Sequence, residues 1–456
     1  MSDGEKDLER LLGSPRRALF HMAAPLFLAL LVGYLQNVID SIWCSGLGAD
    51  ELSAVSISHP VYSLLIAFGG GIGVGATAAI AKLLGESRKE DAEKAAGCTI
   101  FLTAIIAVCS SCVMWFLAEP LASVSGGGNN LGLCMEYLKP FLWMSFFLMM
   151  NGVLTGLLRA EGSSRRSMYL SMTASIANII LDPLMIYGLG MGVKGAAVAT
   201  CLSFLIITVI GLYWYLSGRN YLRLVFNKLR FPREIYRDIA IVGIPCALEM
   251  ILSPLLMIPE QALVVSCGGP DGLVVYINAF HFVHLALIPA MALNKSLVPI
   301  LSAALGQRDV AKMEECIRLT LRIVLGMQLV LGLFIFVAAD ILTEAFMNSP
   351  SMESLRGEMT LATRIFAASA IFNAVQGTGM SVMQASRHAG LATAMTFVRE
   401  FIFLGTYFVA CRISMEAIYW SLDITNLACM LLILWLMRHV MRLVSRDLGL
   451  RRTETI

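Results

Sequence analysis

The sequence predicts an all-α integral membrane protein of about twelve transmembrane helices arranged as two pseudo-symmetric six-helix bundles. Of its 456 residues, 57% are hydrophobic and only 14% are charged, whereas a soluble domain carries about 25% charged residues. Apolar runs of roughly 20 residues, enough to cross about 30 Å of hydrocarbon, recur along the whole chain. Segments about 220 residues apart also resemble each other. The first two observations predict membrane spans, and the third predicts the two bundles.

The predicted helices are separated by short polar connections that leave no room for a soluble domain. Several exceed the minimum length of a span, so tilted or bent helices are expected. The predicted segments are 18–45, 52–83, 95–118, 137–158, 167–188, 195–216, 236–267, 273–305, 317–338, 358–383, 390–411 and 417–440.

The N-terminal tail mixes acidic and basic residues and lacks a small-residue cleavage site, and the apolar stretch after it is too long for a signal peptide. We therefore expect the first helix to be retained. The eleven cysteines fall mostly inside predicted helices, so they are interpreted as small core residues. This interpretation includes Cys109 and Cys112 of the CSSC sequence.

Alternate connections between the predicted helices are rich in Lys and Arg, whereas the others carry almost none. Cytoplasmic loops of membrane proteins retain positive charge, so both termini are expected in the cytoplasm, as an even number of spans requires. The net charge of +2 gives no reason to expect nucleic-acid binding. The basic residues of the connections include Arg88, Lys89, Lys94, Arg159, Arg165, Arg166, Arg219, Arg223, Lys228, Arg230, Arg308, Lys312, Arg438, Arg442, Arg451 and Arg452.

The internal repeat pairs Pro25 with Pro245 and Asp40 with Glu260. An offset of six helices preserves orientation, so the halves are expected to be parallel bundles related by an axis along the membrane normal.

The repeat sets the predicted domain boundaries: an N-terminal lobe over 1–216, a cytoplasmic linker over 217–235 and a C-terminal lobe over 236–456. Repeats of this kind place a cavity between the halves, which is typical of an alternating-access carrier.

Ionisable residues inside the membrane are costly and usually serve an ion or substrate path. Asn178 and Asp182 are spaced i, i+4 and share one helix face. Asp40, Asp182 and Thr200 all lie about five to eight residues from the outer ends of their helices, roughly 8–12 Å at the helical rise. Two nearby carboxylates in low dielectric favour a proton or a cation between them. The alternative is that Asp182 only satisfies nearby backbone groups, that Asp40 caps or lines a hydrated helix end, and that Thr200 bonds back to its own helix.

Pro183 follows Asp182 and has no N–H group, so the carbonyl of Ile179 loses its usual helical partner. This carbonyl lies on the turn beside the acidic face. A carboxylate, an amide oxygen and a free carbonyl are hard oxygen ligands, so the segment predicts a site that exchanges a proton or Na⁺.

Five sequence segments carry a resemblance that extends over nearly the whole chain. They are YLQNVIDSIWCSGLG, GVGATAAIAKLLGE, LLRAEGSSRRSM, NIILDPLMIYGLGMGVKGAAVAT and the shorter VMQASR. In this order and spacing the chain resembles the multidrug and toxic compound extrusion (MATE) family, closest to its prokaryotic DinF-like branch. The resemblance implies two six-helix lobes around an outward-opening V, and extrusion of organic cations or amphiphiles against inward Na⁺ or H⁺.

The resemblance also implies roles for particular residues. The N-lobe cation site of the family maps onto Asp40, Asn178, Asp182 and Thr200, and Pro25 lies where such proteins bend the first span. Gln36 departs from the family pattern, because related chains often have Tyr there.

Further residues are candidates for the cavity or for a second site in the C-terminal lobe. Glu260 answers Asp40 in the repeat, and Asp423 lies at a similar depth near the position that answers Thr200. Lys295 and Arg399 are intramembrane cations. Pairing within the lobe is the default expectation for a buried charge, and a cavity for an anionic substrate group is the alternative.

The run GGGIGVG at 69–75 resembles a phosphate loop, but it lies within a predicted span rather than between a strand and a helix. Small residues that let helices approach closely explain it better.

The sequence thus predicts a secondary active transporter that exports organic cations or amphiphilic drugs in antiport with Na⁺ or H⁺. The alternative is a lipid or lipid-linked glycan flippase of the same superfamily, and a passive channel is a third option. An enzyme is not expected, because HExxH, GxSxG and P-loop motifs are lacking. The expected setting is a monomer in the inner or plasma membrane with no cofactor and no metal beyond Na⁺.

Overall fold

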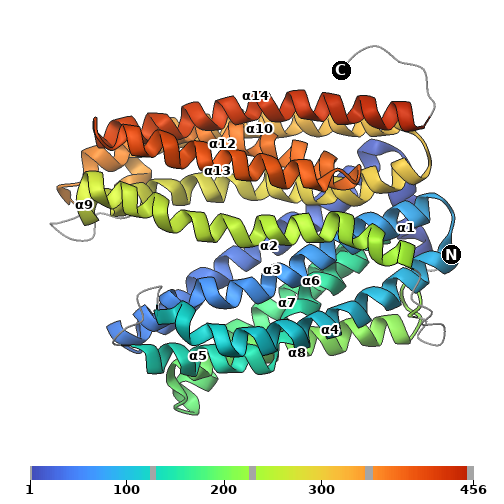
Figure 1. The fold of residues 1–456 in the computed structure, drawn as a ribbon, viewed down its shortest axis with the longest axis horizontal. Helices are drawn as coiled ribbons and strands as arrows, with labels where there is room; N and C mark the ends of the chain where they lie inside the picture. The colour runs from blue at the N-terminus through green and yellow to red at the C-terminus, as the bar shows by residue number, and fades with distance from the viewer. Residues whose placement is uncertain (1–2, 124–129, 225–232, 345–352, 449–456) are drawn as a thin grey trace. The chain divides into compact units, whose positions relative to one another are not determined.

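The structure, a computed structural model, describes residues 3–123, 130–224, 233–344 and 353–448. Over these residues the regular elements are helices (Figure 1). They are α1 (Asp3–Leu12), α2 (Pro15–Ser45), α3 (Ala49–Gly85), α4 (Lys89–Ala122), α5 (Leu131–Trp143), α6 (Ser145–Ala160), α7 (Ser164–Pro183), the π-helical turn η2 (Leu184–Gly188), α8 (Gly192–Leu216), α9 (Arg233–Gly306), α10 (Val310–Glu344), α12 (Arg356–Ala385), α13 (Ala389–Ala410) and α14 (Met415–Asp447).

Within the described ranges, ten helices are long and apolar enough to span a membrane, or eleven if α5 and α6, bent by 57°, form one span. The 74-residue α9 is interrupted at Gly269 (φ 65°, ψ −168°) and contains two of the predicted segments. This backbone conformation is open almost only to glycine, which explains the break. The prediction of an all-α membrane protein is confirmed, and the twelve predicted segments coincide with these elements, except that Met144 separates α5 from α6 and Cys411 follows the end of α13.

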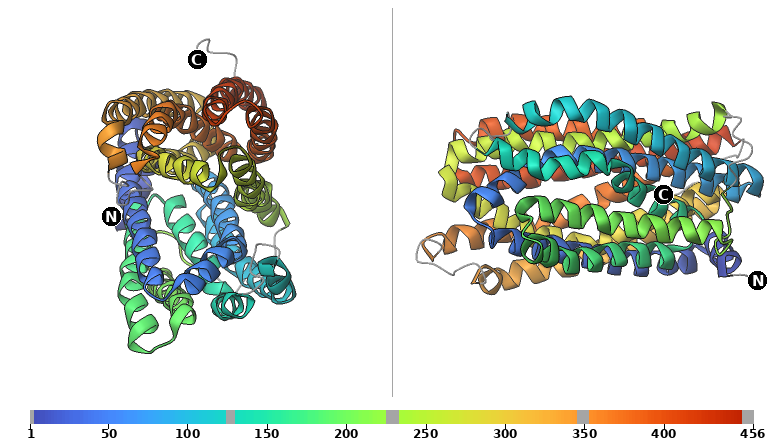
Figure 2. Two further views of the ribbon diagram at one scale, coloured as in Figure 1. Left: turned by 90° about the vertical axis from the view of Figure 1, so that its left-hand side faces the viewer. Right: turned by 90° about the horizontal axis from the view of Figure 1, so that it is seen from below.

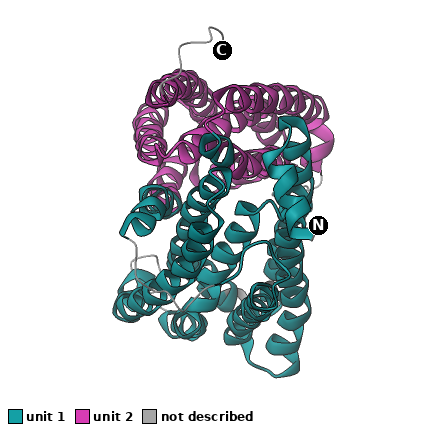
Figure 3. Ribbon diagram, turned by 90° about the vertical axis from the view of Figure 1, so that its right-hand side faces the viewer, with its two compact units in different colours: residues 1–251, 302–307 teal, residues 252–301, 308–456 magenta. Residues whose placement is uncertain are grey.

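Two compact units divide the chain (Figure 3). Unit 1 comprises Met1–Ile251 and Ser302–Gln307, and unit 2 comprises Leu252–Leu301 and Arg308–Ile456. Within each unit the long helices run alongside one another (Figure 2). The lobe boundaries at 216 and 236 stay a prediction, and residues 225–232 of the predicted linker, with Lys228 and Arg230, lie outside the described ranges, as do Arg451 and Arg452.

Each unit has its own apolar core. Unit 1 buries side chains such as Leu65, Phe141 and Met149 at its centre. Unit 2 has a more aromatic core, in which Phe366 contacts Tyr276 and Tyr419 edge to face. Because lipid tails are as apolar as these side chains, the hydrophobic effect does not hold helices together inside a membrane. Close packing of large side chains between the helices stabilises each unit instead.

The GGGIGVG run lies inside α3 and packs against α6. A Cβ atom on Gly73 would collide with the carbonyl group of Gly152, and one on Gly152 would collide with the backbone at Gly69. Only glycine permits this approach of two backbones. The helix-packing interpretation is therefore confirmed.

Several of the short connections end their preceding helix with a residue in the left-handed conformation. Three of these residues are not glycine: Ser87 (φ 61°), Arg308 (φ 57°) and Arg387 (φ 65°). After Ser87, the amide of Arg88 donates to the carbonyl of Leu83 at 2.9 Å, which is the six-residue closure of a helix C-terminus.

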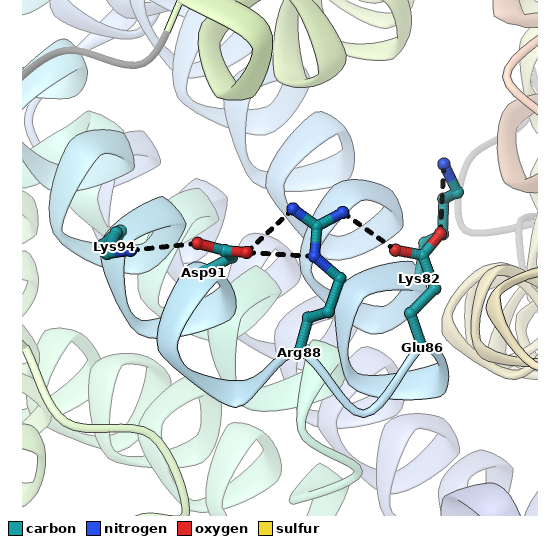
Figure 4. Close-up of polar contacts among 5 residues, drawn as sticks. All are labelled: Lys82, Glu86, Arg88, Asp91 and Lys94. Atoms are coloured by element: carbon teal, nitrogen blue, oxygen red, sulfur yellow. Dashed lines mark hydrogen bonds and ion pairs between the residues drawn. The ribbon is translucent and has the colours of Figure 1, made fainter.

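Charged side chains surround the connection between α3 and α4 (Figure 4). The guanidinium of Arg88 donates to Asp91 at 2.8 Å and to Glu86 at 3.2 Å, and Lys94 donates to the other Asp91 oxygen at 3.0 Å. Lys82 lies 3.5 Å from Glu86. Because these groups are solvent-accessible, each pair contributes little stability, but the chain of contacts orders the turn.

Two sequence expectations differ from the structure. Cys109 and Cys112 are exposed on α4 rather than buried, because that face of the helix is not covered within the unit. The N-terminal tail, expected to be a polar tail, contains helix α1, which buries Leu8 and Leu11. Its carboxylate Asp7 accepts hydrogen bonds from Ser163 at 2.9 Å and pairs with His21 at 3.3 Å, which fastens α1 to the ends of α2 and α6.

Candidate cation site in unit 1

The predicted cation-site residues come together where the ends of α2, α7 and α8 meet. α2 contributes Asp40, α7 contributes Asn178 and Asp182, and α8 contributes Thr200. Asn178 and Asp182 are only 1% and 2% exposed. The i, i+4 spacing places both α7 side chains on the face that packs against α2 and α8.

A continuous set of hydrogen bonds joins these groups. Asn178 Nδ2 donates to Asp182 Oδ1 at 3.1 Å and to Thr200 Oγ1 at 3.4 Å. Gln36 Nε2, one turn before Asp40, donates to Asp40 Oδ2 at 3.3 Å and to Asn178 Oδ1 at 2.5 Å. The residue that departs from the family pattern therefore links the two helices.

The two carboxyl groups face each other. Asp40 and Asp182 lie close enough to interact directly, and two carboxyl groups this close in a low dielectric favour a proton or a cation between them. Asp40 Oδ1 is buried and has no hydrogen-bond partner among the described residues. Within the same residues, no Lys, Arg or His forms an ion pair with either acid. One negative charge in this pair is thus left without a protein counter-ion.

Pro183 ends α7 directly beside this site. Its ring nitrogen cannot donate to the carbonyl of Ile179, and the chain continues in the π-helical turn η2. There the amide of Leu189 donates to the carbonyl of Leu184 at 2.8 Å, five residues earlier. Turns of this type are frequent at functional sites.

Thr200 combines the two roles weighed from the sequence. Its hydroxyl donates to the carbonyl of Ala196 at 3.1 Å, one turn earlier in α8, and accepts from Asn178. The back-bond fixes the hydroxyl, so its lone pairs point toward the α7 side chains.

The ligand oxygens available at this site belong to two carboxylates, an amide and a hydroxyl. All are hard ligands that suit a proton or a small hard cation. The described residues contain no cluster of three or more His, Cys, Asp or Glu with metal-binding geometry. Two carboxylates sharing one proton carry a single negative charge, which matches a monovalent ion. The buried, unpartnered oxygen of Asp40 is consistent with such an ion.

Pro25 lies inside α2 and does not interrupt it, since α2 is one continuous helix from Pro15 to Ser45.

In unit 2, Glu260 on α9 and Glu400 on α13 lie close enough to interact. Arg399 donates to Glu400 Oε1 at 2.5 Å. Pairing of this arginine within its lobe, the default expectation, is what the structure shows. The direct partnership of the two glutamates was not anticipated, although the 220-residue offset carries Asp182 to position 402, within two residues of Glu400.

The other C-terminal candidates lie elsewhere in unit 2. Asp423 on α14 accepts a hydrogen bond from Ser369 on α12, which in turn accepts from Asn426 at 3.4 Å. Asp423 and Glu260 thus belong to different hydrogen-bonded clusters. Lys295 on α9 is exposed.

Comparison with known proteins places these observations in a family. The MatE family model matches residues 25–184 and 245–406, two segments that begin at the offset predicted from the sequence. The chain is 23% identical over 428 residues to the multidrug export protein MepA of Staphylococcus saprophyticus, covering 92% of this chain and 94% of the relative. It is 26% identical over 354 residues to an FAD transporter of Shewanella oneidensis, covering 76% and 78% of the two chains.

Solved structures give the same result. A MOP superfamily transporter from Pyrococcus furiosus, described as having a binding pocket of reverse polarity, superposes with a TM-score of 0.92 at 27% identity, covering 96% of this chain and 99% of that one. An outward-facing multidrug resistance MATE transporter superposes with a TM-score of 0.90 at 26% identity, covering 97% and 99%. The chain is therefore a transporter rather than an enzyme, and it belongs to the MatE family of multidrug and toxic compound extrusion proteins.

Proposed function

We propose that this protein exports organic cations or amphiphilic drugs in antiport with Na⁺ or H⁺, and that Asp40 and Asp182 hold the coupling ion. The observation that carries the proposal is the close pair of carboxyl groups, which form no ion pair with a cation among the described residues. Membership of a family of drug exporters supports the export direction.

In the proposed cycle, the ion enters the unit 1 site and cancels the remaining negative charge of the acid pair. An unpaired charge in a low dielectric is costly, and the packing of α2 against α7 that stabilises it best can differ from the packing favoured without it. Cancelling the charge therefore shifts the balance between the two packings. Gln36 and Asn178 transmit this change, because they are hydrogen-bonded to each other across the two helices, and Gln36 donates to Asp40 while Asn178 donates to Asp182. Bending of α2 near Pro25 would then expel the substrate, and release of the ion to the other side would reset the site.

The membrane setting follows from the charge pattern. We propose a location in the inner or plasma membrane with both termini in the cytoplasm, since the basic connections alternate along the chain. The relatives that are multidrug exporters support a cell-membrane location. A monomer with six-helix lobes over 1–216 and 236–456 is the simplest form of this carrier.

The test is transport in proteoliposomes with the Na⁺ gradient and the pH gradient imposed separately, using a fluorescent organic cation as substrate. One of the two gradients should drive uptake against the concentration of substrate. Asp40→Asn and Asp182→Asn should each abolish the response to that gradient, whereas Asp271→Asn, at an exposed position on α9, should keep it. Full coupled transport in both site variants would refute the proposal.

A second candidate is transport of an anionic amphiphile, such as a dinucleotide or a lipid-linked glycan. Similarity to an FAD transporter and the exposed cation Lys295 on a membrane helix favour it. Flux of FAD and of a fluorescent anionic lipid in the same proteoliposomes distinguishes the two. This alternative would be established if the native protein transports FAD or the anionic lipid but not the organic cation, and if Lys295→Gln abolishes that transport.

A further inference from the structure

The internal repeat gives each unit a pair of acids in corresponding places. In unit 1 the pair is Asp40 on α2 and Asp182 on α7, and in unit 2 it is Glu260 on α9 and Glu400 on α13. In both units the two carboxyl groups lie close enough to interact, and two acids this close in a low dielectric favour keeping one proton between them. After this proton is counted, each pair carries one negative charge.

The two pairs differ in what cancels that charge. Arg399 donates to Glu400 at 2.5 Å, and the two side chains are 19% and 6% exposed. Its positive charge also lies within electrostatic range of Glu260. The cluster of two glutamates, one proton and one guanidinium is therefore neutral as a whole. The unit 1 pair has no such partner among the described residues.

Other titratable groups near the unit 2 cluster do not alter this balance. Tyr276 on α9, Tyr407 on α13 and Cys429 on α14 lie within electrostatic range of it. The hydroxyl groups of the two tyrosines are hydrogen-bonded to each other at 2.8 Å. Phenols ionise near pH 10 and thiols near pH 8.5 in water, so all three are neutral at physiological pH. Asp423 is occupied in a separate cluster with Ser369.

We propose that Arg399 is a built-in counter-ion that takes the place of the coupling cation in unit 2, so that only the unit 1 pair is loaded during transport. Arg399 would then set the number of ions exchanged in each cycle. This inference rests on the proposed ion coupling at Asp40 and Asp182. A guanidinium cannot lose its charge at accessible pH, so the unit 2 pair stays neutral throughout the cycle.

The decisive variants change charge while keeping size. In a background of Asp40→Asn with Asp182→Asn, Arg399→Gln leaves the two glutamates without a counter-ion and should create binding of one cation. Arg399→Lys keeps the positive charge and should not create cation binding. Arg399→Gln combined with Glu400→Gln removes both the guanidinium charge and the carboxylate charge, and it should not create cation binding either. In the otherwise native protein, Glu260→Gln imitates the protonated acid and should leave ion binding unchanged.

The measurement is ion binding by the purified full-length protein in lipid nanodiscs. Equilibrium binding of ²²Na⁺ and proton uptake in weakly buffered solution are counted per protein molecule. The native protein should lose its ion in the Asp40→Asn, Asp182→Asn background, and Arg399→Gln should restore one ion per molecule there. Loss of the ion in Glu260→Gln, or no gain in folded Arg399→Gln, would overturn the inference.

These outcomes separate the inference from the proposed function. If Glu260→Gln and the double aspartate variant both reduce ion binding, ion coupling stands and the role of Arg399 fails. If the native protein binds neither ion and its transport does not respond to either gradient, the proposed function fails. Ion binding gained in the Arg399→Gln variant still decides the role of the arginine. Should Arg399→Gln not fold, the Glu260→Gln result decides alone.

Discussion

The buried carboxyl group of Glu161 should make stability depend on pH in an unusual direction. Glu161 lies between α6 and α7, is fully buried, and accepts a hydrogen bond from the amide of Leu222 at 3.1 Å. Burial raises the pKa of Glu161 to about 8, because it outweighs the stabilising effect of that hydrogen bond and of the nearby charge of Arg166. The ordinary value is 4.5.

The magnitude follows from these two pKa values. Below pH 4.5 the carboxyl group is protonated in both the folded and the unfolded chain, and there is no effect. Between pH 4.5 and about 8 the folded protein holds more protons than the unfolded chain, so stability falls by up to about 1.4 kcal/mol per pH unit. Above pH 8 the cost is complete, and it amounts to a few kcal/mol. Glu161→Gln cannot ionise and should remove this dependence.

The assay is thermal unfolding of purified protein at several pH values from 5 to 9, comparing each variant with the native chain under the same conditions. Glu161→Gln should unfold at nearly the native temperature at pH 5 and at a higher temperature at pH 8 to 9. The matched control is Glu90→Gln, at an exposed position on α4, which should follow the native protein. If the unfolding temperatures of the native protein and Glu161→Gln differ by the same amount at every pH, ionisation of Glu161 is not the cause of the pH dependence.

Three further changes test other parts of the structure. Gln36→Ala removes both hydrogen bonds of that amide and should weaken apparent affinity for the coupling ion by roughly five- to thirtyfold, about 1–2 kcal/mol; an unchanged ion dependence of transport would contradict this. Ser87→Gly relieves a left-handed backbone (φ 61°) and should stabilise the protein by about 1 kcal/mol in thermal unfolding, whereas Ser87→Val should destabilise it. Gly85→Ala places a Cβ against the carbonyl of Ala303 and should cost about 1–3 kcal/mol, with exposed Gly357→Ala as the control.

Much of the fold was predictable because membrane spans are encoded locally. A run of apolar residues specifies a helix wherever the backbone has no water to bond to, so the predicted segments coincide with observed helices, although 137–158 is divided between α5 and α6. The bend between α5 and α6 and the amphipathic helix α1 were missed. α1 has only ten residues, and the tertiary contacts of Asp7 that hold it depend on partners far along the chain.

The geometry of the unit 1 cluster was predictable from depth and periodicity, since Asn178 and Asp182 share a helix face and Asp40 lies at the same level. Its ion-binding role stays a prediction. The bridging position of Gln36 was not predictable, because it depends on how α2 and α7 are rotated about their own axes. The pairing of Glu260 with Glu400 was obscured because the repeat slips by two residues at that point.

The side chain of Gln36 has a further consequence. Its amide ends in a group that donates on one side and accepts on the other, and in the arrangement described here the donating side faces Asp40 and Asn178. A half-turn about its last bond would present the carbonyl oxygen instead. A tyrosine hydroxyl has no such pair of opposite ends, so a glutamine at the junction of two helices can offer either a donor or an acceptor to the groups around it through rotation about a single bond.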